Sequence, residues 1–295
     1  MFWLKHAFSG SNMATMCRAQ AAVLALQDIV GLAPSQVSLI GTFISDGVGG
    51  FLPTSFENAN VEDARTLAAS PAGGVCVGGN KAVGCFDIAA DGTPTLISAA
   101  STGFTSLNEA ITVDASGSWL LLPIVTQNSI QVYRIDPVSG ALSFASSASV
   151  VGTPAGILLS ADNQHLVVVL SDINIVSVRQ FDPVTGTLPS SPQPTVYPVG
   201  SNPSRVVVGA FTGSSPFGYA VTNKDSNTLS LLPGDATGPT GPQTSYSLAC
   251  SPTSIAVSDL DGDNDSDIVI SCSASPPLTV LLNSNGQGGF VPSQP

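Results

Sequence analysis

The sequence is poor in charge, and above all in positive charge. Only 9% of its 295 residues are charged, whereas ordinary globular domains have about 25%. Eight lysines and arginines stand against 20 acidic residues, which gives a formal net charge of −12. Proteins that bind nucleic acids or anionic membranes neutralise phosphates with clusters of such cations. The composition therefore argues against both as partners.

Long apolar runs are also missing. A membrane-spanning helix needs roughly 18 to 20 consecutive apolar residues, and the most apolar stretch, Met13 to Leu32, is interrupted by Arg18 and Asp28. This excludes a membrane span, and no clear signal peptide is recognisable. Because this stretch is rich in alanine and leucine and is followed by Pro34, we expect a short N-terminal helix there.

A repeat of about 46 to 50 residues runs along the chain. Residues 111–142 match 157–188 without gaps, and Asp136-Pro-Val falls on Asp182-Pro-Val. Prolines spaced at equal intervals precede three of the alternating apolar runs: Pro154, Pro203 and Pro252. Each repeat reads as four short antiparallel strands separated by polar turns, which is the unit of a β-propeller blade.

We therefore expect an all-β fold, a β-propeller of four-stranded antiparallel blades. A helical and irregular segment at 1–35 precedes the propeller at 36–295, which begins with half a blade at 36–58. Five blades follow, at about 60–105, 106–150, 151–200, 201–249 and 250–292. This count leaves two alternatives open, a six-bladed ring closed by both ends of the chain and an incomplete ring.

The two central repeats resemble lactonase-like propeller repeats. The resemblance covers Ser106 to Leu188 and rests on Asp114-Ala-Ser-Gly117 and on Asp136-Pro-Val-Ser-Gly140-Ala-Leu142, which recurs as Asp182-Pro-Val-Thr-Gly186-Thr-Leu188. It implies the blade architecture and raises lactone hydrolysis as a possible activity. It carries no active residues across, because folds host many functions.

The last repeat contains five aspartates within nine residues: Asp259, Asp261, Asp263, Asp265 and Asp267. Without a cation these carboxylates would repel one another. Gly262 permits a tight turn that folds them inward, and alternating hard oxygen ligands are what Ca²⁺ binds. The pattern predicts one Ca²⁺ site, and the alternative is a solvated acidic turn that binds nothing.

The same segment, Pro252 to Phe290, resembles an FG-GAP or VCBS repeat of integrin α-like propellers. The resemblance implies side-chain ligation of Ca²⁺ by Asp259, Asp261, Asp263 and Asp267, and ligation by the backbone carbonyl of Asp265. Such repeats occur in surface proteins, which favours an extracellular or cell-surface location.

The five cysteines leave the redox state open. Cys76 with Cys85, and Cys250 with Cys272, flank expected hairpins and could form disulfides, which would suit an oxidising compartment. The alternative is that they are small buried apolar residues. Cys17 would be left unpaired in the bridged case.

Groups for catalysis are scarce. The only histidines are His6 and His165, and the sequence has no Gly-x-Ser-x-Gly elbow and no Cys-x-x-Cys pair. We expect a structural role for His165, at the start of a core strand, and we assign no catalytic residue. The sequence thus favours a non-catalytic, calcium-stabilised, monomeric extracellular repeat protein that binds a protein or glycan through its loops. The alternative is a lactonase-like hydrolase of a sugar or acyl lactone, acting at the central channel.

Overall fold

The chain is built from β-strands. The computed structural model describes residues 21–26, 39–45, 51–58, 62–69, 74–89, 93–103, 110–211, 215–273, 278–283 and 289–293. Within them, the one helical element is a 3-10 turn at Val125–Gln127. The chain divides into two compact units, residues 1–126 with 133–145 and residues 127–132 with 146–295. The predicted all-β fold is confirmed.

The first unit begins with two antiparallel sheets. The first has the order β1-β2-β3, formed by Ala21–Leu26, Leu39–Ser45 and Phe51–Asn58. The second has the order β4-β5-β6-β7, formed by Glu62–Ala69, Gly74–Asn80, Ala82–Ile88 and Pro94–Ser101. A third sheet, in which the division between the units falls, has the order β11-β10-β9-β8 and contains Thr112–Val113, Trp119–Ile124, Ser129–Ile135 and Leu142–Ser149.

The short N-terminal helix expected over Met13 to Leu32 is wrong where the structure describes this stretch. Ala21–Leu26 forms strand β1, which pairs antiparallel with β2 from Ala21↔Ile44 to Leu26↔Leu39. An apolar run of this length fits a helix or a strand equally well by composition. Pairing with β2 supplies hydrogen-bond partners to its backbone, and this tertiary contact decides the outcome.

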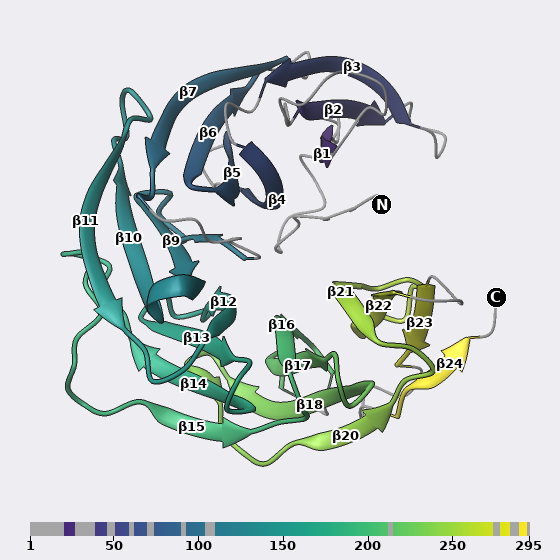
Figure 1. Cartoon of the computed structure of the whole chain (residues 1–295). Coiled ribbons are helices and arrows are strands. Elements are labelled where there is room, and N and C mark those ends of the chain that lie inside the picture. The colour runs from purple at the N-terminus through teal and green to yellow at the C-terminus, as the bar shows by residue number, and fades with distance from the viewer. Residues whose placement is uncertain are drawn as a thin grey trace. The chain divides into compact units, whose positions relative to one another are not determined.

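The second unit contains three further sheets, drawn in teal, green and yellow in Figure 1. The first has strands β12 to β15 in sequence order, formed by Pro154–Leu159, His165–Leu170, Ile175–Gln180 and Thr195–Pro198. The second contains β16 to β20, formed by Pro203–Gly209, Gly218–Asn223, Thr228–Asp235, Gly238–Pro239 and Thr244–Ser247. The third has β21 to β24, formed by Pro252–Ser258, Asp267–Cys272, Leu278–Leu282 and Val291–Ser293.

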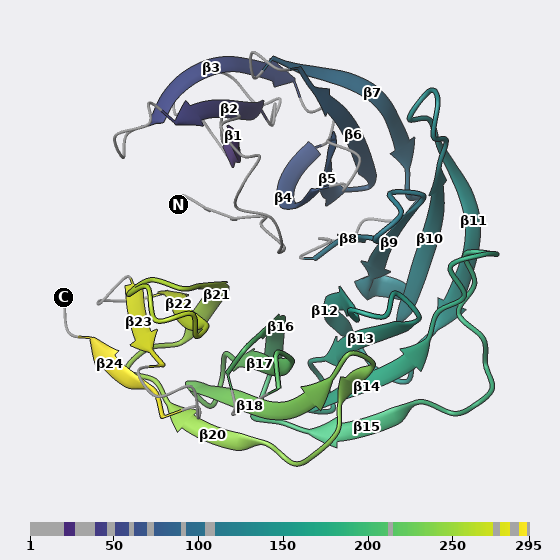
Figure 2. The ribbon, with the colours of Figure 1, turned by 180° about the vertical axis from the view of Figure 1, so that it is seen from behind.

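In this unit the sheets are arranged as successive propeller blades. Their first strands, β12, β16 and β21, lie side by side in Figures 1 and 2, and β16 contacts both of the others. The strongly apolar second strands supply the core, since all six residues of β17 and five of six in β13 are buried. Val167 and Val169 on one sheet pack with Val206 and Val221 on the next. The apolar faces of neighbouring sheets therefore bury one another.

The blades of the second unit share their backbone hydrogen bonds as well as their strand order. In each, the amide after the second strand donates to the carbonyl before the first strand. The three pairs are Ser171 to Thr153 at 2.9 Å, Lys224 to Asn202 at 2.9 Å, and Ser273 to Ser251 at 3.0 Å. The structural repeat therefore follows the spacing found in the sequence, and the five sheets from β4 to β24 are the blades of a β-propeller fold.

No helix within the described ranges is long and apolar enough to cross a membrane.

Candidate functional site

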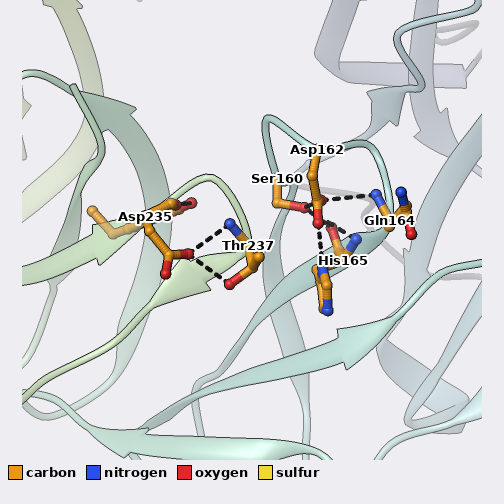
Figure 3. Close-up of polar contacts among 7 residues, drawn as sticks. Ser160, Asp162, Gln164, His165, Asp235 and Thr237 are labelled. Carbon is orange, nitrogen blue, oxygen red and sulfur yellow. Dashed lines mark hydrogen bonds and ion pairs between the residues drawn. The ribbon is translucent and has the colours of Figure 1, made fainter. Parts of the chain in front are cut away.

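A polar cluster forms at the turn between β12 and β13, where Ser160, Asp162 and His165 converge (Figure 3). The imidazole Nδ1 of His165 lies 2.7 Å from the Oδ2 of Asp162. The other carboxylate oxygen accepts the Gln164 amide at 2.9 Å and also contacts the Ser160 hydroxyl. The Ser160 oxygen in turn accepts the backbone amide of His165 at 3.0 Å. The turn therefore fixes both the carboxylate and the start of the histidine strand.

The protonation of this pair follows from its contacts. Burial acts to raise the pKa of Asp162, but hydrogen bonds from Ser160, Gln164 and His165 outweigh burial and lower it. The carboxylate is thus ionised at neutral pH and accepts the Nδ1 proton. A neutral His165 then carries its lone pair on Nε2. The two side chains are 26% and 21% exposed, so solvent reaches the pair.

A second acid, Asp235, lies on the neighbouring blade at the end of β18 (Figure 3). The Asp162 amide donates to the Ala236 carbonyl at 3.1 Å, which ties the two turns together. The Thr237 hydroxyl and amide donate to Asp235 at 2.6 and 2.8 Å and lower its pKa. The carboxylates of Asp162 and Asp235 are therefore both charged at neutral pH.

Tyr219 completes this arrangement from β17. Its hydroxyl donates to the Asp235 backbone carbonyl at 2.9 Å, and its side chain is fully buried. Burial raises the pKa of Tyr219, and the negative charges of Asp235 and Asp162 raise it further. The phenol therefore stays protonated and acts as a fixed hydrogen-bond donor.

The equivalent turn one repeat earlier holds an acid in a different position. Asp114, 46 residues before Ser160, is fully buried and accepts the amides of Ser118 and Trp119, both at 2.7 Å, and the hydroxyl of Ser116 at 2.6 Å. Serine and aspartate have exchanged places between the two turns. The exchange leaves one oxygen of Asp162 for the imidazole, which stands where Trp119 stands in the earlier copy. Aligning the repeats at this offset is the sequence signal that points to the pair.

The predicted calcium ligands come together only in part. Asp259, Asp261 and Asp267 place one carboxylate oxygen each within 4.8 Å of one another, whereas Asp263 and Asp265 are outside this group. Asp267 is buried and accepts backbone amides from Leu260 at 2.7 Å and Asn283 at 2.8 Å. Asp259 accepts the Gly262 amide at 2.7 Å, with Gly262 at a φ of +84°. Slight desolvation and the charges of Asp263 and Asp267 raise the pKa of Asp261, which is an exposed side chain.

Both cysteine pairs form disulfides. Cys76 is bonded to Cys85 between β5 and β6, and Cys250 to Cys272 at the end of β22. The bridged alternative is therefore the one that the structure adopts. Cys17 and His6 lie outside the described residues.

Together these features define a β-propeller protein with an acid–histidine pair at a blade turn. The family model described as "Lactonase, 7-bladed beta-propeller" matches residues 77–207, a little under half of the chain. Asp162 and His165 both lie inside this match, as do the Asp136 and Asp182 turns. None of the curated proteins compared with the sequence matches it.

Solved structures with the same fold include two sugar lactonases by description. A candidate 6-phosphogluconolactonase of Bacteroides fragilis has a TM-score of 0.74 and 15% identity, over 96% of this chain and 83% of that one. The periplasmic gluconolactonase of Pseudomonas aeruginosa has a TM-score of 0.71 and 17% identity, over 93% of this chain and 84% of that one. At these identities the likeness establishes the fold.

The expectation of a non-catalytic binding or adhesion protein is wrong. The lactonase match and these structures favour the alternative drawn from the central repeats, a lactonase-like hydrolase. The sequence lacks a nucleophile motif, but this absence does not exclude a hydrolase, because hydrolysis by water requires a positioned base and no side-chain nucleophile. The resemblance of Pro252 to Phe290 to an FG-GAP repeat lies outside the matched residues and stays a prediction.

Proposed function

We propose that this protein hydrolyses a lactone, with water as the nucleophile and His165 as the general base. The observation that carries the proposal is the 2.7 Å contact between His165 Nδ1 and Asp162, inside the residues that match the lactonase model. This contact leaves Nε2 as the basic atom of a solvent-accessible imidazole. Ser160 is not the nucleophile, because its hydroxyl is used by Asp162 and by the backbone of His165.

The proposed reaction needs only His165, Asp162, one water molecule and the lactone. His165 Nε2 takes a proton from water as the water oxygen bonds to the lactone carbonyl carbon. The ring C–O bond then breaks, and the departing ring oxygen receives the proton from His165, which yields the open hydroxy acid. Asp162 holds the imidazole in the required tautomer and stabilises the imidazolium that forms in between.

The test is a panel of sugar and acyl lactones, with release of the hydroxy acid as the readout. We expect His165→Gln to lower kcat by about 10² to 10⁴ without a change in melting temperature. Asp162→Asn should have a loss of the same order, because an amide can favour the wrong tautomer. Asp182→Asn is the matched control, since this half-buried aspartate caps an Asp-Pro turn of the same blade. Absence of turnover on every lactone, or full activity in His165→Gln, would overturn the proposal.

We also propose that the last blade binds one Ca²⁺ ion in a structural role. The donor set fits, because three carboxylate oxygens lie within 4.8 Å of one another and one belongs to the fully buried Asp267. Oxygen ligands at short range are what Ca²⁺ prefers. Asp259, Asp261 and Asp267 would hold the ion, and the resemblance noted above adds the Asp263 side chain and the Asp265 carbonyl. The ion would stabilise the loop between β21 and β22.

An extracellular or cell-surface location is part of the same proposal. Its support is the pair of disulfides, Cys76–Cys85 and Cys250–Cys272, since such bonds persist in oxidising compartments.

A further inference from the structure

We infer that the lactone hydrolysed at His165 is uncharged, and that this site discriminates against phosphorylated or otherwise anionic lactones. The inference rests on the proposed function, since it concerns the substrate of the same site. It is carried by the charges around His165 and by the positions of the cations in the second unit.

Two carboxylates lie on the His165 turn and on the turn that adjoins it. Asp162 contacts the imidazole at 2.7 Å, and Asp235 lies on the adjoining turn, which is tied to Asp162 through the Ala236 carbonyl. Contacts within each turn lower the pKa of both carboxylates, so both are charged at neutral pH. The negative charge of Asp162 also acts on Asp235. An anionic group on the substrate would add to this charge.

Positive charge is scarce in this unit as a whole. Its sequence contains ten aspartates and three basic residues, which are Arg179, Arg205 and Lys224. Arginine and lysine are the favoured partners of a bound phosphate, and this unit can offer only these three.

Arg179 does not share a sheet face with His165. It pairs across β13 and β14 with Leu166, whereas His165 pairs with Gln180. Neighbouring residues of a strand point to opposite faces of the sheet, so the two side chains lie on opposite faces. The guanidinium Nη1 of Arg179 also donates to the Ser149 carbonyl at 2.7 Å, on the strand β11.

The other two cations lie toward the far end of the neighbouring blade. Tyr219, which contacts Asp235, is the second residue of β17, whereas Arg205 is paired with Thr222 near the end of that strand. Three residues of strand span about 10 Å, and Lys224 follows two residues after Thr222. Arg205 and Lys224 therefore lie toward the end of this blade opposite Asp235, whereas Asp162 is tied to the turn that carries Asp235.

The test compares an aldonolactone with the same lactone phosphorylated on its primary hydroxyl, using the whole chain. We expect kcat/KM for the uncharged lactone to be about 10 to 100 times higher at about 20 mM salt. Raising the salt to about 300 mM should increase kcat/KM for the phosphorylated lactone and leave the uncharged one nearly unaffected. Asp235→Asn should shift the ratio of the two toward the phosphorylated lactone, whereas Asp182→Asn, on another turn of the His165 blade, should leave the ratio unchanged.

The outcomes separate the two proposals. An equal or higher kcat/KM for the phosphorylated lactone would overturn this inference while lactone hydrolysis stood. An unchanged ratio in Asp235→Asn would overturn the electrostatic origin on which the inference depends. Turnover of neither lactone, nor of any other in the panel, would overturn the proposed function itself.

Discussion

Ser160 takes the place of Asp114 in the equivalent turn 46 residues later, and both accept the amide that opens the following strand. Asp114 receives the amide of Trp119 at 2.7 Å, and Ser160 receives the amide of His165 at 3.0 Å. The amides of Asp114 and Ser160 themselves donate to the carbonyls of the same two strand residues, each at 2.9 Å. The turn can therefore be closed by either residue type.

The exchange gives a direct test of the acid–histidine pair. The double variant Ser160→Asp with Asp162→Ser recreates the order of the earlier turn, so we expect it to fold with a melting temperature within a few degrees of the parent. It removes the carboxylate from Nδ1 of His165, so lactone hydrolysis should fall about 10² to 10⁴-fold. Calorimetry and lactone turnover measure the two effects. Full activity in this variant would show that His165 needs no carboxylate partner.

Much of the fold was predictable because the residues that recur in the repeat are those that tight turns require. The Asp-Pro turns at Asp136 and Asp182 end in Gly140 and Gly186, which adopt φ values of +67° and +68°. Glycine favours this region, so its spacing marks equivalent turns. Ala21–Leu26 was not predictable in this way, because an apolar run acquires its structure from the strand beside it.

The site was harder to predict than the fold. Asp162 and His165 are three residues apart in a sequence that offers no motif, and only the turn geometry brings Oδ2 to Nδ1. The contribution of Asp235 was not visible at all, because it comes from the next blade, 70 residues along the chain. The sequence did indicate the aspartates of the last blade, of which Asp259, Asp261 and Asp267 gather.

Calcium should stabilise the protein against heat. A ligand that binds only the folded state adds about 2.7 kcal/mol at 100 times its dissociation constant, so the melting temperature should rise by several degrees with millimolar Ca²⁺ and return with a chelator. Asp261→Asn should weaken the shift. Asp225→Asn serves as control, because this exposed aspartate bonds to Asn202 on another loop. A melting temperature independent of Ca²⁺ would reject the site.

Stability should fall in acid, and Asp162 should contribute to the fall. Its pKa is lowered in the folded state, so its contribution is present above the unfolded value of about 3.9 and is lost as the pH falls through the folded value. Denaturant unfolding between about pH 5 and pH 2 should thus show a shallower pH dependence in Asp162→Asn than in the parent protein. An identical pH dependence of the unfolding free energy in the two proteins would contradict a lowered pKa of Asp162 in the folded state. The contribution of Asp261 to stability has the opposite pH dependence. Its raised pKa favours the folded state at low pH when no cation is bound.

Thiol chemistry should report both disulfides. In the unreduced, denatured protein one cysteine, Cys17, should react with a thiol label, and all five should react after reduction. Reduction should lower the free energy of unfolding, typically by about 2 to 4 kcal/mol for each bridge. The Cys250–Cys272 bridge closes the longer loop, with a separation of 22 residues against 9, and should contribute more. Labelling of all five thiols without reductant would refute both bonds.

The closures from Thr153 to Ser171, from Asn202 to Lys224 and from Ser251 to Ser273 each join a backbone carbonyl to a backbone amide. Repeats that are closed by backbone hydrogen bonds can diverge independently, because a substitution in the turn of one repeat leaves these bonds intact in every repeat. New chemistry can then arise in a single module at little risk to the rest, as a histidine in place of a tryptophan illustrates.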